Sequence, residues 1–242
     1  MQPGRIHCNP AGRKEVCMAD TELIRRLEKA SLDTKLRLLD LCRQTVIHIG
    51  GDLSVCDMMT AIWQYAMRYD VKNPRWEGRD RFVLSKGHCT PALYSTMAQR
   101  GFFPLEELKQ FRRIEGHMSG HAEMRHVKGV DMSTGSLGQG ISAAVGMALA
   151  GKADGRDYRV YALLGDGELA EGQVWEAAMS AAKYKLDNLC AFVDLNGLQI
   201  DGKTADVMPT APVYKKFEAF NWNVLTLDGH DCAAVADALE QA

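Results

Sequence analysis

The chain lacks an excess of charge of either sign. Its 242 residues include 29 Lys and Arg and 31 Asp and Glu, so the formal net charge is -2. Such a balance argues against a dedicated nucleic-acid-binding protein and against an acidic disordered chain. With 46% hydrophobic and 25% charged residues, the composition is that of a globular protein long enough to bury a sizeable core. We therefore expect one large domain.

The cysteines lack the spacing of a disulfide framework or of a zinc site. There are seven of them, an odd number, and no two are spaced as Cys-x-x-Cys. Chains of this length rarely depend on a disulfide scaffold, and the clustered ligands that zinc requires are missing. We expect buried free thiols in a reducing compartment, the cytoplasm.

A secretory signal and a membrane-spanning run are missing too. Residues 1–17 contain Pro and Gly but no apolar run, which excludes a secretory signal peptide. We expect residues 1–18 to be a disordered leader and residues 19–242 to form the domain. The charge-free stretch 132–151 is too rich in Gly and Ser for a membrane span. It predicts a loop running into a buried helix, and we expect no membrane attachment.

Apolar runs alternate with helical periodicities along most of the chain. Continuous apolar runs predict buried strands at residues 81–85, 159–164, 189–193 and 223–227. Helical spacing predicts helices at residues 91–100, 171–184 and 232–241. Strands buried on both faces and alternating with helices indicate an α/β fold, a parallel sheet flanked by helices with right-handed crossovers. Earlier in the chain, Ser54 and Asp57 have the spacing of a capping box, which predicts a helix beginning there.

Polar residues follow two of the predicted strands. Gly165-Asp166-Gly167 ends one strand, and Asn196 stands thirty residues after Asp166 at the end of the next. A βαβ unit takes about thirty residues, so both side chains should lie at the carboxyl ends of neighbouring parallel strands, where open α/β sheets bind ligands. A carboxylate and an amide oxygen suit Mg²⁺ or Ca²⁺. The glycines let the backbone approach a diphosphate closely.

Simpler explanations exist for this pattern. Asp-Gly and Asn-Gly can be plain turns, and a lone Gly-Asp-Gly would favour that explanation. An EF-hand loop starting at Asp194 is excluded, because Gly197 occupies its fourth rather than its sixth position. Gly135, Gly138 and Gly140 resemble a dinucleotide fingerprint in reverse order, but no strand precedes them.

Further motifs make the chain resemble the transketolases from about Leu32 to the C-terminus, and several ordered motifs are stronger than one. The matching motifs are DRFVLSKGH at residues 80–88, GH at 120–121, STGSLGQGIS at 133–142, GDGELAEGQVWE at 165–176 and LNGLQIDG at 195–202. The resemblance implies the thiamine-diphosphate-binding fold, with this chain as the diphosphate-binding domain. Deoxyxylulose-phosphate synthase shares Gly-Asp-Gly, but its segment before the long helix differs from residues 134–140.

The resemblance also implies a set of ligands. In transketolases the metal, Mg²⁺ or Ca²⁺, is held by residues that match Asp166, Asn196 and the carbonyl of Leu198. An apolar residue that packs beside thiamine diphosphate matches Ile200, and Gly167 would contact the diphosphate. The other positions matched to cofactor contacts are His88, Gly135, Leu137, Gly165 and Glu168.

Histidines line the substrate channel of the family, and His48, His88 and His121 match them. A lone histidine is more often structural, yet imidazoles near neutrality can move protons and bind sugar hydroxyls. Glu171 and Glu176 match acidic residues that join two cofactor sites across a dimer, with a solvated helix face as the alternative. For Lys86 we expect a surface position or a place near phosphate rather than catalysis.

The family's second domain, which binds the aminopyrimidine and supplies an activating glutamate, has no matching pattern here. The resemblance therefore implies one subunit of a split transketolase, with two copies of this chain and two of a separate pyrimidine-binding subunit. Such an enzyme moves a two-carbon ketol unit from a ketose, or its phosphate, to an aldose. The alternatives are a non-catalytic cofactor-binding or regulatory paralogue, or a related synthase. The helical pattern that reaches Ala242 suggests truncation or a longer natural subunit.

Overall fold

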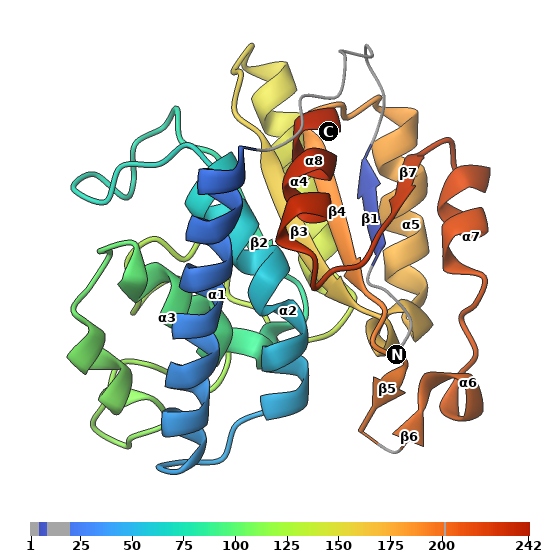
Figure 1. Cartoon of the computed structure of the whole chain (residues 1–242). Coiled ribbons are helices and arrows are strands. Elements are labelled where there is room, and N and C mark those ends of the chain that lie inside the picture. Colours follow the sequence, from blue (N-terminus) through green and yellow to red (C-terminus); the bar gives the residue numbers. More distant parts are fainter. Residues whose placement is uncertain (1–4, 9–19, 201) are drawn as a thin grey trace.

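The computed structural model describes residues 5–8, 20–200 and 202–242 and centres on one five-stranded sheet (Figure 1). The strand order is β2-β3-β4-β1-β7. The strands are β1 (Arg5–Cys8), β2 (Arg81–Leu84), β3 (Val160–Gly165), β4 (Leu189–Asp194) and β7 (Asn223–Thr226). β2, β3 and β4 pair in parallel, whereas β1 pairs antiparallel with β4 and β7. The four strands expected from the apolar runs are all present, and the predicted α/β fold is confirmed.

Within the expected disordered leader, Arg5–Cys8 form strand β1 between β4 and β7. The pairing supplies backbone hydrogen-bond partners to the neighbouring strands. The sequence did not predict this strand, because it has four residues and only one aliphatic side chain. The rest of the predicted leader, residues 1–4 and 9–18, lies outside the described residues.

Helices cover both faces of the sheet. One face packs against α1 (Thr21–Cys42), α2 (Ile49–Ala61), α3 (Thr90–Gln99) and α8 (Cys232–Gln241). The other packs against α4 (Gln139–Ala153), α5 (Gly172–Lys183) and α7 (Val213–Ala219). Alternate strand residues enter the two cores: Phe82, Tyr161 and Phe192 face the first, whereas Val83, Ala162 and Ala191 face the second. Burial on both faces explains why the strands are continuously apolar.

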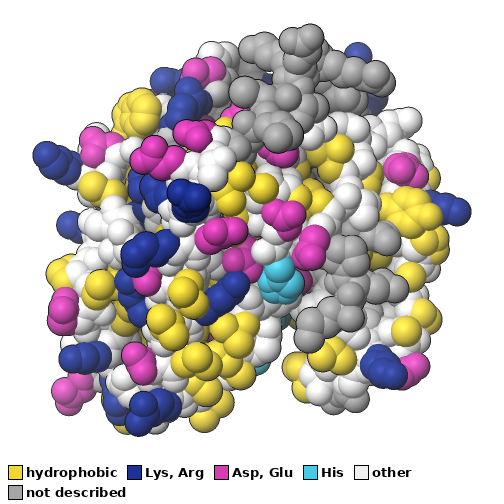
Figure 2. Space-filling model, viewed as in Figure 1, with side chains coloured by type: hydrophobic (Ala, Val, Ile, Leu, Met, Phe, Trp, Pro, Cys, Tyr) yellow, Lys and Arg dark blue, Asp and Glu magenta, His cyan; other side chains and the backbone are white. Residues whose placement is uncertain are grey.

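Short elements connect these layers. They are the π-helix η1 (Ile62–Ala66), the 3-10 turns η2 (Gly87–Cys89), η3 (Leu105–Gln110) and η4 (Gly167–Ala170), the hairpin β5 (Leu198–Gln199) and β6 (Gly202–Lys203), and α6 (Thr204–Val207). The hairpin and α6 lie beyond one end of the sheet (Figure 1). Residues 132–138 form a loop that leads into α4, as predicted. Within the described ranges, no helix has the length and apolarity needed to cross a membrane. Figure 2 shows basic and acidic side chains interspersed over one face.

The predicted capping box is wrong, because α2 begins at Ile49 and holds Ser54 and Asp57 in its interior. Both side chains bond to distant segments instead of to the helix backbone. Ser54 Oγ donates to Asp194 Oδ1 at 2.7 Å, and Asp57 accepts from α1. Local spacing alone could not reveal these long-range partners.

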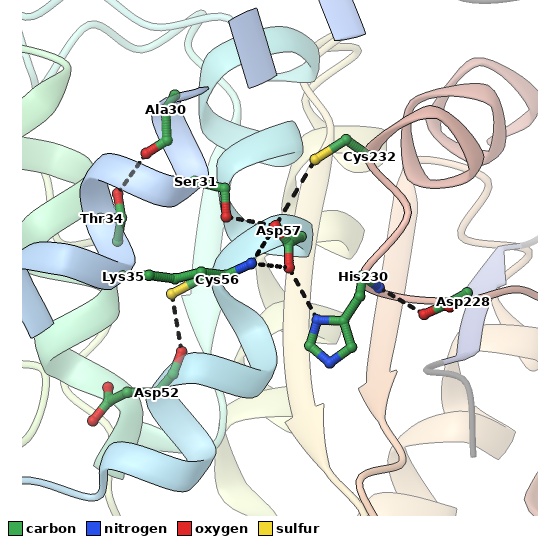
Figure 3. Close-up of polar contacts among 10 residues, drawn as sticks. All are labelled: Ala30, Ser31, Thr34, Lys35, Asp52, Cys56, Asp57, Asp228, His230 and Cys232. Atoms are coloured by element: carbon green, nitrogen blue, oxygen red, sulfur yellow. Dashed lines mark hydrogen bonds and ion pairs between the residues drawn. The ribbon is translucent and has the colours of Figure 1, made fainter. Parts of the chain in front are cut away.

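Asp57 lies at the centre of a polar cluster that joins α1, α2 and the start of α8 (Figure 3). Its carboxylate is buried and accepts from Lys35 Nζ at 2.7 Å and from Ser31 Oγ at 2.5 Å. His230 Nδ1, from the loop before α8, lies 3.0 Å from Asp57 Oδ2. Burial raises the pKa of Asp57, but the hydrogen bonds from Lys35, Ser31 and His230 outweigh burial and bring the pKa below its usual value.

We expect Asp57→Asn to lower the free energy of unfolding by about 2–3 kcal/mol at pH 7, because hydrogen bonds to a charged group are lost. The folded pKa of Asp57 is depressed, so its stabilising effect is present above the unfolded pKa and disappears as the pH falls through the folded pKa. Urea unfolding at neutral and acidic pH measures both effects. Asp33→Asn, which removes the exposed Lys29–Asp33 pair, is the control and should cost less than about 1 kcal/mol. Equal losses in the two variants would contradict the role assigned to Asp57.

Candidate active site

The ends of β3 and β4 bring the two predicted metal-binding turns together. Gly165 lies opposite Asp194 in the parallel register, and the backbone N–H of Asp166 donates to the Asp194 carbonyl at 3.1 Å. Asp166 Oδ2 then accepts from the backbone N–H of Gly197 at 2.7 Å. The Gly-Asp-Gly turn and the Asn196 turn therefore touch, as their spacing predicts.

The oxygen atoms at these turns suit a hard cation. Asp166 also accepts from Gly167 N and Thr204 Oγ1, and Asn196 Oδ1 accepts from Leu198 N at 2.9 Å. Burial raises the pKa of Asp166, and although hydrogen bonds oppose this effect, the pKa stays above its usual value. A buried carboxylate in this state would gain from a divalent cation. In the described part of the chain, no group of three or more His, Cys, Asp or Glu is placed to hold a metal. Amide and carbonyl oxygens would therefore complete the ligand set.

Beside the Gly-Asp-Gly turn, the backbone of Gly167 lies close to the side chain of Gln199. A Cβ at Gly167 would lie 3.0 Å from Gln199 Cβ, and Gln199 Nε2 is a buried donor with no partner among the described residues. An anionic oxygen such as that of a diphosphate would satisfy such a donor. Reasoning from the sequence missed Gln199, because a glutamine in a two-residue hairpin strand carries no spacing signal.

The loop 133–138 presses against the turn that carries His88. A Cβ at Gly87 would lie 2.7 Å from the backbone nitrogen of Gly135. Gly135 has φ +146°, and a Cβ there would lie 2.8 Å from the His121 ring. Only glycine fits at these two contacts, so the approach of the two loops requires it at both positions.

The three predicted channel histidines gather around these loops. His48 is the N-cap residue of α2, His88 lies in η2, and the two ring centroids are 5.2 Å apart. Burial, the charge of Lys86 and the neighbouring histidines lower the pKa of His88 to about 4. Burial, Arg112 and His121 lower the pKa of His48 as well. Neutral imidazoles can both donate and accept hydrogen bonds to sugar hydroxyls.

Glu168 was predicted as a cofactor contact, but the structure directs it inward. Its carboxylate is buried and accepts from Ser85 Oγ, from the Gly138 N–H at 2.8 Å and from the Gly165 N–H at 3.1 Å. Every one of these donors belongs to the protein, so Glu168 ties the end of β2 and the start of α4 to the Gly-Asp-Gly turn. The predicted contact of Glu168 with the cofactor stays a prediction.

Other predicted contacts lie on the surface. Leu198 is 62% exposed and Ile200 is 95% exposed, while Leu137 is exposed just before α4. Glu171 and Glu176 are also exposed, and Glu171 Cβ lies 2.7 Å from where a Cβ would stand at Gly138. These side chains are accessible to a cofactor or to another subunit, and their roles stay predictions.

Lys86 is not a surface lysine, which corrects that expectation. Its side chain is 2% exposed, and Nζ lies 2.7 Å from Asp194 Oδ2. The sequence signal that we missed is the position of Lys86 directly after a predicted buried strand and before Gly87. In the structure Gly87 packs against the loop 133–138. Burial raises the pKa of Asp194, but Lys86 and the hydrogen bonds outweigh burial, so the pKa lies below its usual value.

Comparison with known proteins gives the family. The sequence model of one protein family, described as the transketolase thiamine diphosphate binding domain, matches residues 34–242. The chain belongs to the transketolase family. It is 47% identical over 214 residues to a 6-deoxy-6-sulfo-D-fructose transketolase subunit, SqwG, of Clostridium sp. (strain MSTE9), covering 88% of this chain and 78% of that protein. It is 42% identical over 209 residues to one subunit of the apulose-4-phosphate transketolase of Phocaeicola vulgatus, covering 86% and 74%.

Solved transketolases share the fold. A mutant transketolase from Pichia stipitis superposes with a TM-score of 0.83 at 35% identity, over 88% of this chain and 33% of that one. The chain thus spans about a third of the length of that transketolase. The resemblance inferred from the motifs is confirmed, and the sheet and helices form the thiamine-diphosphate-binding α/β fold of a transketolase subunit.

Asp52, on α2 near His48, is a buried acid whose pKa rises to about 7, chiefly because of burial. Oδ1 accepts from Ala92 N at 3.1 Å, whereas Oδ2 has no partner within the described ranges. The protonated form is thus favoured on folding, and its stabilising effect is lost as the pH rises from about 4 to about 7. In this pH range the Asp52 carboxyl makes the free energy of unfolding fall by about 1.4 kcal/mol per pH unit. We expect Asp52→Asn to abolish this slope. Unfolding measured from pH 4 to 8 tests this, and parallel profiles for variant and parent would contradict it.

Proposed function

We propose that this chain is the diphosphate-binding subunit of a two-subunit transketolase. The enzyme transfers a two-carbon ketol unit from a ketose, or ketose phosphate, to an aldose or aldose phosphate. The observation that carries the proposal is the contact of Asp166 with the turn that holds Asn196, near the three histidines at one end of the sheet. The match to a thiamine diphosphate binding domain supports it.

The residues at the turns fit a metal and a diphosphate. Mg²⁺, or Ca²⁺, would be held by Asp166, Asn196 and the Leu198 carbonyl, whose oxygens suit a hard cation. Gly167 and the buried Gln199 donor would face the diphosphate. The contacts carried over from the family are His88, Gly135, Leu137, Gly165 and Ile200. Thiamine diphosphate, when bound, supplies the electron sink for breaking and forming the carbon–carbon bond.

The histidines handle the hydroxyl protons of the sugar. His88 is neutral at physiological pH because its pKa is about 4, so it can accept a hydroxyl proton or donate from its own ring N–H. His48 and His121 lie next to it and offer further ring nitrogens. Burial is the main cause of this low pKa, and the Lys86 charge lowers the pKa of His88 further.

A separate pyrimidine-binding subunit completes the enzyme. The chain spans about a third of single-chain transketolases, and its relatives in Clostridium and Phocaeicola are named as subunits. The exposed Ile200 would be covered by cofactor and partner. Two copies of each chain fit the exposed Glu171 and Glu176, because an acidic link between two sites requires a two-fold assembly. The cysteines whose side chains the structure describes are free thiols, which fits a reducing compartment such as the cytoplasm.

We expect the purified chain to lack ketol-transfer activity and to gain it when a pyrimidine-binding subunit is added. In the family the second domain covers the aminopyrimidine and supplies the activating glutamate, so this chain alone would leave that part of the cofactor in water. A ketose panel, each member tested with an aldose acceptor, measures the activity and names the donor class. Full activity of the lone chain would contradict the split enzyme, and no activity in the complex would favour a non-catalytic paralogue.

We expect Asp166→Ala to abolish Mg²⁺-dependent binding of thiamine diphosphate, because the carboxylate is the one charged ligand of the proposed metal site. Isothermal calorimetry of the complex with and without Mg²⁺ measures this loss. Asp206→Ala, at an exposed acid on the nearby α6, is the matched control and should bind as the parent does. Unchanged affinity in Asp166→Ala would remove the metal assignment.

A further inference from the structure

Lys86 and Asp194 form an ion pair in the interior, directly behind the proposed metal site. Their side chains are 2% and 3% exposed, and the charged atoms are 2.7 Å apart. Burying two charges is expensive, and replacing such a pair by apolar residues is often neutral or stabilising. Stability alone therefore does not explain the pair, and its contacts point to a task at the site.

Asp194 connects the ion pair to Asn196, a residue of the proposed metal site. Its Oδ2 accepts from Lys86 Nζ and also from Asn196 Nδ2 at 3.0 Å. Because the amide nitrogen of Asn196 is held by Asp194, the amide oxygen must point to the opposite side, where it accepts from Leu198 N at 2.9 Å. The carboxylate thus sets which end of the amide is presented to a cation.

The same carboxylate also fixes two histidine-bearing elements. Asp194 Oδ1 accepts from Ser54 Oγ of α2, the helix that begins after His48. Lys86 stands two residues before His88 in the chain. One buried pair therefore joins the α2 helix, the His88 turn and the Asn196 turn.

We propose that the Lys86–Asp194 pair is a positioning device that holds Asn196 with its amide oxygen toward the metal and thereby sets the affinity for the metal and diphosphate. This inference rests on the proposed function. Both side chains are almost fully buried, so the pair would act through Asn196 rather than on the substrate. Replacing groups that orient a metal ligand typically weakens metal affinity by about 10–100-fold.

Lys86→Met tests the device, because it leaves Asp194 in place but removes the cation that fixes it. Calorimetry of the two-subunit complex, well below the melting temperature of each variant, measures Mg²⁺ affinity at saturating thiamine diphosphate. We expect about a 10–100-fold loss, with kcat changing much less once both Mg²⁺ and cofactor are saturating. This split separates ligand positioning from a general loss of structure.

Asp131→Asn is the matched control. It breaks another buried pair, Arg79–Asp131, which lies at the opposite end of β2, where Asp131 Oδ2 accepts from Phe82 N at 2.8 Å. We expect it to lower stability and leave Mg²⁺ affinity unchanged. Equal affinity losses in Lys86→Met and Asp131→Asn would overturn the inference, as would unchanged affinity in Lys86→Met.

A double variant covers the case in which Lys86→Met does not fold. Lys86→Met with Asp194→Asn removes both charges and restores a neutral interior, and it should fold but bind Mg²⁺ more weakly than the parent. Parent-like affinity in the double variant would overturn the inference. If the parent complex itself binds no thiamine diphosphate with Mg²⁺, the proposed function fails, which is a different result from failure of the positioning device.

Discussion

The pairing of β3 with β4 is the constraint on which the candidate site depends. The two strands run in parallel, and their register places Gly165 opposite Asp194. Two turns from different parts of the sequence therefore begin at the same level of the sheet, close enough for Asp166 to bond to the Gly197 backbone. The loop 133–138 and the His88 turn then pack against each other next to these turns, through contacts that leave room only for glycine.

The sequence was sufficient to predict the strands and the meeting of the two turns. It was insufficient to predict which charged side chains are buried. Continuous apolar runs predicted the strands, since both faces are buried, and the thirty-residue spacing of Asp166 and Asn196 predicted the meeting of their turns. The burial of Lys86 was not predicted, and neither were the partners of Glu168, because these partners are Asp194, Ser85 and two backbone N–H groups from separate segments. Charged residues are usually exposed, so only the three-dimensional packing shows which of them are enclosed.

The buried charges around these turns do not cancel. Lys86 balances Asp194, whereas Asp166 and Glu168 are buried without a cation in an ion pair among the described residues. Burial raises the pKa of both carboxyls, and burial together with the Lys86 charge lowers the pKa of His88. The interior is thus short of positive charge at the point where we propose a divalent metal, while burial and Lys86 lower the pKa of the nearby His88.

The strand side chains that face the two cores differ in size, and this difference disfavours a one-residue slip in strand pairing. Phe82, Tyr161 and Phe192 point to the side of α1, α2 and α8, whereas Val83, Ala162 and Ala191 point to the side of α4 and α5. The facing positions of α4 and α5 are themselves small, with Ala144, Ala148, Ala177, Ala178 and Ala181 buried there. A strand that paired one residue out of step would turn an aromatic ring toward these alanines. Overpacking of this kind would destabilise the mispaired sheet relative to the native register.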